Sequence, residues 1–248
     1  MERKFEPVMS GGQQPPATGF PDRSIDVGSN APSVDTNTVL RNTYWLLALS
    51  MLPTIAGAFV GMQMNFIGLF MAAPIMTPLL MFAAMIGSLF IVTRLRNSGW
   101  GVVALFGFTF IAGLMLTPIL TVAGGLRNGG QLVGLAGGMT AAIFFAMAAI
   151  ATVTKKDFSF MGKFLFIGMI LLIIASLANL FFQVPAFSVA LSGIAVLIFS
   201  AYILYDISNI VRGGETNYIM ATMGLFLNVY NIFISLLNIL MFFTGQRD

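Results

Sequence analysis

The chain alternates between long apolar segments and short polar loops, after a polar first stretch. Seven apolar segments are long enough, at about 1.5 Å per residue, to cross the roughly 30 Å hydrocarbon core of a bilayer as helices. They run approximately over residues 43–62, 66–91, 101–123, 132–153, 161–182, 186–209 and 218–243. The pattern predicts an all-α membrane protein with seven transmembrane helices.

Three of these segments contain proline. Pro53 lies in the first, Pro74 and Pro78 lie in the second, and Pro118 lies in the third. Membrane helices tolerate proline where neighbouring groups satisfy the freed carbonyls. We therefore expect bent helices at these positions and no breaks.

Residues 1–38 are rich in glycine, proline and polar residues and have almost no adjacent apolar ones. Such a stretch cannot bury enough surface to fold alone, so we predict a disordered cytoplasmic tail followed by a transmembrane domain over residues 39–248. The tail is either a passive linker or a handle for a cytoplasmic partner. It lacks the apolar core of a signal peptide, so we expect the first helix to direct insertion.

Composition supports the membrane class and excludes several chemistries. The chain is 58% apolar and 8% charged, whereas soluble domains carry about a quarter charged residues. It has no cysteine and no histidine, which excludes disulfides, Cys/His zinc sites and histidine acid–base catalysis. The net charge of +3 comes from scattered basic residues, so we expect no nucleic-acid binding. We expect no enzyme activity, no metal site and no cofactor.

The distribution of lysine and arginine predicts the orientation. If the N-terminus is cytoplasmic, ten basic residues lie on the inside and two on the outside, as the positive-inside rule requires. Seven spans then place the C-terminus in the periplasm. The inside residues are Arg3, Lys4, Arg23, Arg41, Arg94, Arg96, Lys155, Lys156, Lys163 and Arg212, and the outside residues are Arg127 and Arg247.

The seventh segment carries a polar stripe. Asn228, Asn231, Ser235 and Asn238 recur at intervals of three, four and three, which places them on one face of a helix. Unsatisfied amides in hydrocarbon are costly, so this face must meet protein or water, and the segment is predicted to lie at the centre of the bundle. The stripe either joins helices or lines a polar path. The same polarity leaves a re-entrant seventh segment as an alternative to a full span.

Asp206 is the one ionisable residue well inside an apolar segment. A membrane aspartate is expensive unless it is protonated, hydrogen-bonded or paired, and Arg94 and Arg96 are the candidate ion-pair partners on the same predicted side. Asp206 is either one half of a structural ion pair or a titrating latch on a cytoplasmic gate.

The fourth segment contains a ladder of small residues at every fourth position, which predicts close packing against another helix. The ladder comprises Gly130, Gly134, Gly138, Ala142 and Ala146.

The last two segments carry a recognisable pattern. YILYDISNI over residues 202–210, GGETNYIMAT over 213–222 and LFLNVYNIFISLLNIL over 225–240 resemble the C-terminal signature of the Bax inhibitor-1 family, and most closely its bacterial YccA branch. The resemblance implies a seven-helix fold in which six helices wrap the last one.

The resemblance also implies two alternative functions. Some family members conduct calcium in a pH-dependent leak controlled by two aspartates; the first matches Asp206, whereas the second position is Asn228 here. An amide cannot share a titrating proton with a carboxylate, so the pair of aspartates that would sense pH is incomplete here. Calcium binding is therefore expected to be weak. The YccA branch instead implies an inner-membrane protein, surrounded by the lipid bilayer, that binds the FtsH-type protease complex and restrains its proteolysis. We expect this second function, with the leak of calcium or protons as the alternative.

Overall fold

The computed structural model describes residues 35–64, 66–154 and 156–245. These residues form helices joined by short loops, and no strand occurs among them. The predicted tail of residues 1–38 lies mostly outside the described residues. The helices of the described part are α1 (Thr36–Gln63), α2 (Phe66–Ala72), α3 (Met76–Leu95), α4 (Trp100–Met115), α5 (Thr117–Gly124), α6 (Gly129–Thr154), α7 (Met161–Phe182), α8 (Pro185–Val211) and α9 (Tyr218–Gly245).

Within the described residues, six helices are long and apolar enough to cross a membrane: α1, α3, α6, α7, α8 and α9. Helices α4 and α5 meet the same criterion only together, and a bend of 41° separates them. The structure thus confirms an all-helical membrane protein, with six spans, or seven if α4 and α5 form one bent span. Helix α9 runs unbroken over 28 residues.

The prolines act differently in the three segments that contain them. Helix α1 continues through Pro53, where the hydroxyls of Ser50 and Thr54 each donate to a carbonyl one turn earlier. The helical structure is interrupted at residues 73–75, around Pro74, and again at Leu116, two residues before Pro118. The expectation of bends without breaks was therefore wrong at Pro74 and at Pro118, because proline supplies no N–H and its ring displaces the preceding turn.

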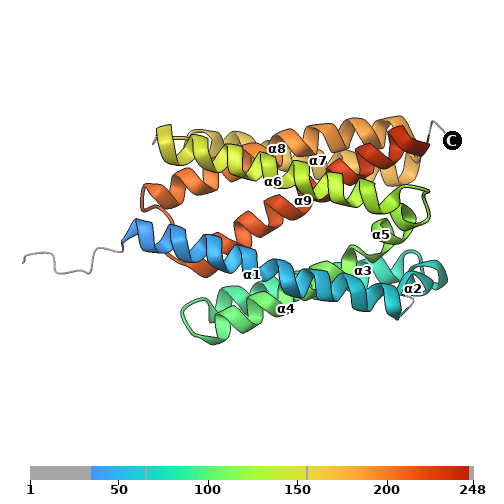
Figure 1. Ribbon diagram of the computed structural model, residues 1–248, viewed down its shortest axis with the longest axis horizontal. Coiled ribbons are helices and arrows are strands. Elements are labelled where there is room, and N and C mark those ends of the chain that lie inside the picture. Colours follow the sequence, from blue (N-terminus) through green and yellow to red (C-terminus); the bar gives the residue numbers. More distant parts are fainter. Residues whose placement is uncertain (1–34, 65, 155, 246–248) are drawn as a thin grey trace, which may run out of the picture. The chain divides into compact units, whose positions relative to one another are not determined.

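The long helices pack in two groups that α9 connects (Figure 1). Helices α1, α3 and α4 form one group, and α6, α7 and α8 form the other. Helix α9 packs against α8, α6 and α1, and over fewer residues against α3, α4 and α5. In Figure 1 it runs obliquely between α1 and α6.

Helices α1 and α4 approach at backbone distance. A Cβ atom at Gly57 would lie 2.1 Å from the carbonyl oxygen of Phe110, and one at Gly113 would lie 2.1 Å from that of Thr54. Only glycine fits at either position. This crossing is the close helix contact that small residues make possible in membranes.

The glycine–alanine ladder of α6 does not make the predicted contact. All five of its residues are exposed, and a Cβ at any of its three glycines would meet nothing within 4 Å. The expectation that this ladder packs against another helix of the chain was wrong. Small residues every fourth position allow close approach, but they do not specify which helix approaches.

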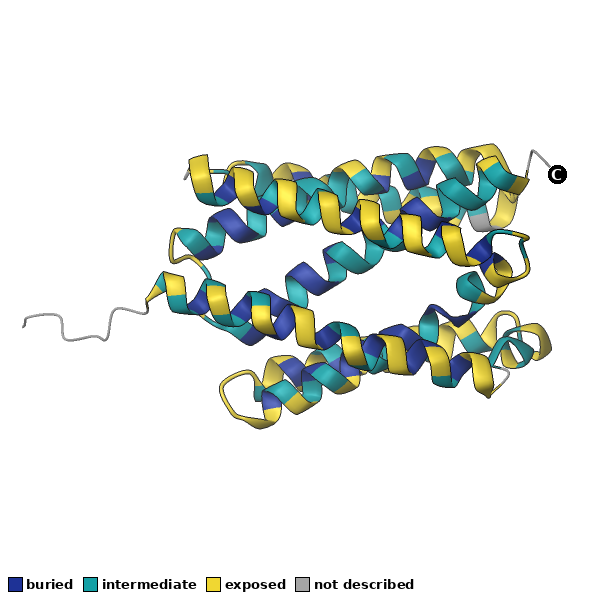
Figure 2. Cartoon of the chain, viewed as in Figure 1, coloured by how far each residue is buried: buried dark blue, intermediate teal, exposed yellow. Residues whose placement is uncertain are grey.

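Large apolar side chains cover the outside of the described helices. Phe90 is 72% exposed and Phe181 is 84% exposed, and exposed positions follow the outer faces of the long helices (Figure 2). In water such a surface would be costly, whereas lipid chains are as apolar as leucine. The surface is that of a protein surrounded by lipid.

Candidate functional site

The side chains of Asp206 and Asn228 join α8 to α9. Asp206 lies in the last two turns of α8 and is half-buried, and Asn228 lies in the third turn of α9 and is 6% exposed. Asn228 Nδ2 donates a hydrogen bond of 2.7 Å to Asp206 Oδ2. One turn earlier on α9, a Cβ atom at Gly224 would lie 3.4 Å from the same oxygen, so the carboxylate lies directly against this face of α9.

Arg94 and Arg96 do not reach Asp206. Both are exposed near the end of α3, which packs against α2, α4 and α9, whereas α8 packs against α1, α6, α7 and α9. Among the described residues the only ion pair joins Arg212 to Asp157. The partner that the structure gives Asp206 is an amide of α9, because α9 lies on the face of α8 that carries the aspartate.

The polar stripe of α9 meets α8 at two levels. At the first level Asn228 binds Asp206, and at the second Asn238 Nδ2 donates to the hydroxyls of Ser188 at 3.2 Å and Ser192 at 2.8 Å. Asn231 donates instead to the carbonyl oxygen of Leu227 in its own helix. Ser235 is buried. Two of the three amides therefore donate to side chains of α8.

The C-terminal end of α8 and the loop after it contact the loop between α6 and α7. The Ser208 hydroxyl donates to the carbonyl oxygen of Lys156 over 3.0 Å. Arg212 forms its ion pair with Asp157, whose carboxylate also accepts from the backbone N–H of Ser159. We call this end of the bundle the Arg212 end. Sequence reasoning missed Asp157, because a charged residue in a polar loop gives no signal of its partner.

The same loop binds the α3–α4 loop through Asn217. Its side-chain oxygen accepts from the backbone N–H groups of Ile219 and Met220, so Asn217 caps α9. Its Nδ2 donates to the carbonyl oxygen of Arg96 at 2.9 Å and to Oδ1 of Asn97 at 3.0 Å. The start of α9 is therefore attached to the helix group that contains α3 and α4.

A glycine pair makes the tight turn before this cap. Gly213 has φ 76°, a conformation that glycine adopts without strain. A Cβ at Gly214 would lie 2.0 Å from Oδ1 of Asn209. Gly213 therefore suits this turn by its backbone conformation, and a side chain at position 214 would require the Asn209 side chain to move.

Comparison with known proteins places this arrangement in a family. A family model described as "Inhibitor of apoptosis-promoting Bax1" matches residues 36–245, which include every helix from α1 to α9. The chain belongs to the Bax inhibitor-1 family.

Three relatives show how much of the chain this Bax inhibitor-1 relationship covers. The "Modulator of FtsH protease YccA" of Escherichia coli K12 is 38% identical over 230 residues, which is 92% of this chain and 100% of the relative. The "Inner membrane protein YccA" of Escherichia coli O6:H1 matches with the same figures. An uncharacterised protein of Pseudomonas aeruginosa is 43% identical over 201 residues, 81% of this chain and 87% of its own.

In this Bax inhibitor-1 family member the Asp206–Asn228 pair does not fit a resident calcium ion. Calcium in proteins takes roughly six to eight oxygen ligands. Asn228 turns its nitrogen to Asp206, and no group of three or more histidine, cysteine, aspartate or glutamate side chains gathers among the described residues. The pair can link two helices and exchange a proton at one carboxylate, but it does not surround a metal.

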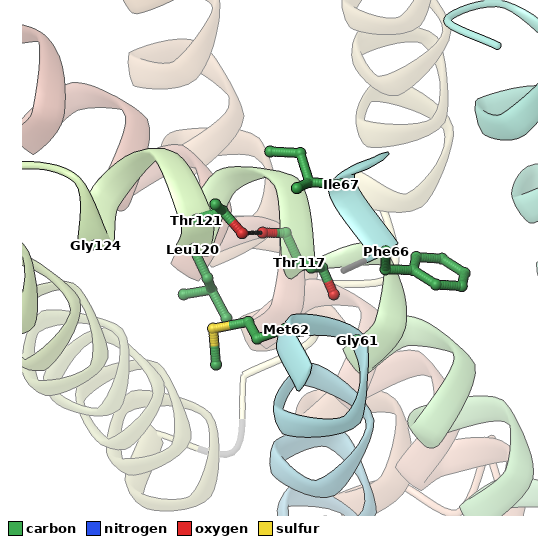
Figure 3. A pocket seen from close by; sticks show the side chains of 8 residues that line it. All are labelled: Gly61, Met62, Phe66, Ile67, Thr117, Leu120, Thr121 and Gly124. Atoms are coloured by element: carbon green, nitrogen blue, oxygen red, sulfur yellow. Dashed lines mark hydrogen bonds between the residues drawn. The ribbon is translucent and has the colours of Figure 1, made fainter. Parts of the chain in front are cut away.

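A small cavity lies at the opposite end of the bundle, where α1, α2 and α5 meet (Figure 3). Its volume is about 320 Å³, and its lining contains threonine hydroxyls but no charged residue. Thr121 donates to the carbonyl oxygen of Thr117, and the Thr117 hydroxyl is buried against Gly61 without a hydrogen-bond partner. No residue that could act as a general acid or base beside these hydroxyls lines the cavity.

Proposed function

We propose that this chain is an inner-membrane protein that binds an FtsH-type membrane protease and restrains its proteolysis. The observation that carries the proposal is the match to the modulator of FtsH protease of Escherichia coli K12, which extends over the full length of that relative. A match over 92% of this chain favours a shared activity more than a match to one motif. The relative from Escherichia coli O6:H1, named an inner membrane protein, supports the location.

The proposal includes seven spans with α9 at the centre. Treating α4 and α5 as one bent span gives seven. The contacts of α9 with both helix groups and its buried Leu225, Ile232 and Leu237 support a central position.

The orientation we propose has the Arg212 end in the cytoplasm. Among the described residues, Arg41, Arg94, Arg96, Lys156, Lys163 and Arg212 lie at or near this end, and Arg127 lies at the other. Juxtamembrane basic residues are retained on the cytoplasmic side. Residues 1–34 would then be on the same side as an ATP-driven protease domain, where they could serve as its handle.

Recovery of the protease from cross-linked membranes tests the proposal. The tagged full-length chain should recover the FtsH-type protease and lengthen the half-life of a membrane substrate. A matched variant replaces residues 2–34 with a Gly/Ser linker of equal length, which is flexible but carries none of the native side chains. It should insert normally and lose part of the effect on substrate half-life. Absence of the protease from the cross-linked material would contradict the proposal.

A pH-sensitive calcium leak gated around Asp206 is the second candidate. The observation that favours it is the carboxyl group of Asp206, which is half-buried inside a predicted span. Liposomes loaded with a calcium dye distinguish the two functions: the leak predicts flux that changes with pH, disappears in Asp206→Ala and increases in Asn228→Asp. If none of these proteins leaks at any pH, the channel is excluded and the protease proposal stands on the cross-linking result.

A further inference from the structure

A large apolar groove separates α1 from α6. Its volume is about 870 Å³, and its lining comes chiefly from these two helices and from α9. Figure 1 shows α9 between them. Met51 and Phe59 line it from α1, Phe144 lines it from α6, and Phe226 and Phe233 line it from α9. Because all three helices are membrane spans by length and composition, the groove lies at the depth of the lipid chains.

The size of the groove favours a lipid chain over a protein helix. A transmembrane helix about 30 Å long and 10 Å across encloses roughly 2,400 Å³, so only one face of such a helix could enter the groove, whereas a single acyl chain is narrow enough to lie within it. The observed volume lies in the range of pockets that hold small molecules, roughly 300–1,000 Å³. Water is a poor occupant of an apolar cavity at this depth, whereas lipid chains are always adjacent.

One polar group in the lining indicates where the head of such a lipid would lie. Four residues that line the groove carry hydroxyls, and three of these hydroxyls donate within the protein: Thr54 to Ser50, Thr140 to Ala136 and Tyr230 to Ala112. The fourth, the hydroxyl of Tyr44, is buried and has no hydrogen-bond partner. A buried hydroxyl without a partner costs free energy that a ligand acceptor would recover.

Tyr44 lies at the level of the lipid ester groups. It lies eight residues after the start of α1, which is about 12 Å along the helix axis. The whole helix is about 42 Å long and is therefore longer than the hydrocarbon core by about 12 Å. If this excess is shared between the two ends, Tyr44 is about 6 Å inside the boundary, within reach of its amphipathic side chain. Its neighbour Trp45 is 67% exposed, as in an interfacial aromatic belt, and Arg41 is exposed one turn nearer the surface.

We propose that this groove is a binding site for one phospholipid. An acyl chain fills the space between α1, α6 and α9, the Tyr44 hydroxyl donates to an ester or phosphate oxygen, and Arg41 favours an anionic headgroup. Neither Asp206 nor Asn228 lines the groove, so this site is separate from the contact on which the alternative leak depends.

Two neighbouring glycines of α6 provide a matched test. A Cβ at either Gly137 or Gly138 would meet nothing within 4 Å, but only Gly137 lines the groove. The wild type, Gly137→Leu and Gly138→Leu are reconstituted in vesicles of equal parts phosphatidylethanolamine and phosphatidylglycerol with identical acyl chains. The phospholipid retained after detergent extraction is then counted by native mass spectrometry. We expect one retained phospholipid for the wild type and Gly138→Leu, enriched in phosphatidylglycerol, and about tenfold less for Gly137→Leu, a difference equivalent to about 1.4 kcal/mol.

Two tyrosine variants keep the test decisive if a leucine variant fails to fold. Tyr44→Phe should lower retention roughly threefold to tenfold through the lost donor, whereas Tyr230→Phe should not, because its hydroxyl binds Ala112. Equal retention in Gly137→Leu and Gly138→Leu, or no effect of Tyr44→Phe, overturns the proposal. So does a dimer that only Gly137→Leu dissociates, or a cross-link from position 137 to the protease, since either result assigns the groove to a protein partner.

Discussion

Removing the hydrogen bond between Asn228 and Asp206 should weaken the attachment of α9 to α8 by a measurable amount. In soluble proteins a hydrogen bond to a charged group contributes about 1.5–3 kcal/mol. Between membrane helices the measured coupling averages about 0.6 kcal/mol and reaches about 1.7, because the unfolded chain in the membrane also finds partners. Asn228 is 6% exposed and the bond is 2.7 Å long, so we place the coupling near the upper membrane value, at about 1.5 kcal/mol.

A double-mutant cycle isolates this coupling. Asp206→Ala, Asn228→Ala and the double variant are unfolded reversibly from mixed micelles with sodium dodecyl sulfate, and helix content is followed by circular dichroism. The matched cycle pairs Asp206→Ala with Asn231→Ala, because the Asn231 amide donates within its own helix. We expect coupling in the first cycle only. A value for Asn228 below about 0.5 kcal/mol, the usual error of additivity, or equal to that for Asn231, would refute the reasoning.

Three further variants test the packing and the loops. Gly113→Ala should lower the free energy of unfolding by about 3 kcal/mol or more, because the new Cβ meets a backbone carbonyl of α1. Gly107→Ala, on the same helix, meets nothing and should raise the free energy of unfolding by up to about 1 kcal/mol. Equal unfolding midpoints for the two variants would contradict the α1–α4 contact. Asn217→Ala should lower the free energy of unfolding by about 1–2 kcal/mol, because the helix cap is lost, and Thr216→Ala should lower it by less. Thermal unfolding compares the two variants, and the reverse order would exclude Asn217 as the cap. Arg212→Ala should lower the free energy of unfolding by under about 1 kcal/mol, and by less at high salt, because both partners of its ion pair are substantially exposed. A large loss of stability that salt does not change would show that Arg212 acts by packing.

Hydropathy was sufficient to predict most of the helices. The predicted segment 161–182 coincides with α7, and the segment predicted from 218 begins where α9 begins. Long apolar runs bounded by charged or glycine-rich loops have few alternatives in a bilayer, since backbone groups must be satisfied within the segment.

Contacts between helices were harder to predict. The regular ladder from Gly130 to Ala146 faces outward, whereas the isolated Gly57 and Gly113 make the close contact. Spacing describes one helix, but a contact requires two complementary surfaces at the same depth, and the sequence does not state which helices are neighbours. The candidate pairing of Asp206 with arginines failed for the same reason: it used the shared side of the membrane, while the neighbour of Asp206 is the asparagine of α9.

The sequence showed that Asn228 replaces the second aspartate implied by the family resemblance, but it did not show which group the amide contacts. The amide occupies the place of the second carboxylate that the family resemblance implies, and it satisfies Asp206 through a single donor. The site therefore has a helix-joining contact in the position where a titrating pair is expected, which favours the protease proposal over the channel.

The most direct test of the account is proteolysis in a defined membrane. The FtsH-type protease and a membrane substrate are reconstituted in liposomes with ATP, with or without this protein, and with the equal-length linker variant as the control. The account predicts that the full-length protein slows substrate degradation in proportion to its amount, without changing the rate of ATP-dependent degradation of a soluble substrate to the same extent. Unchanged degradation of the membrane substrate at every ratio of this protein to the protease would contradict it.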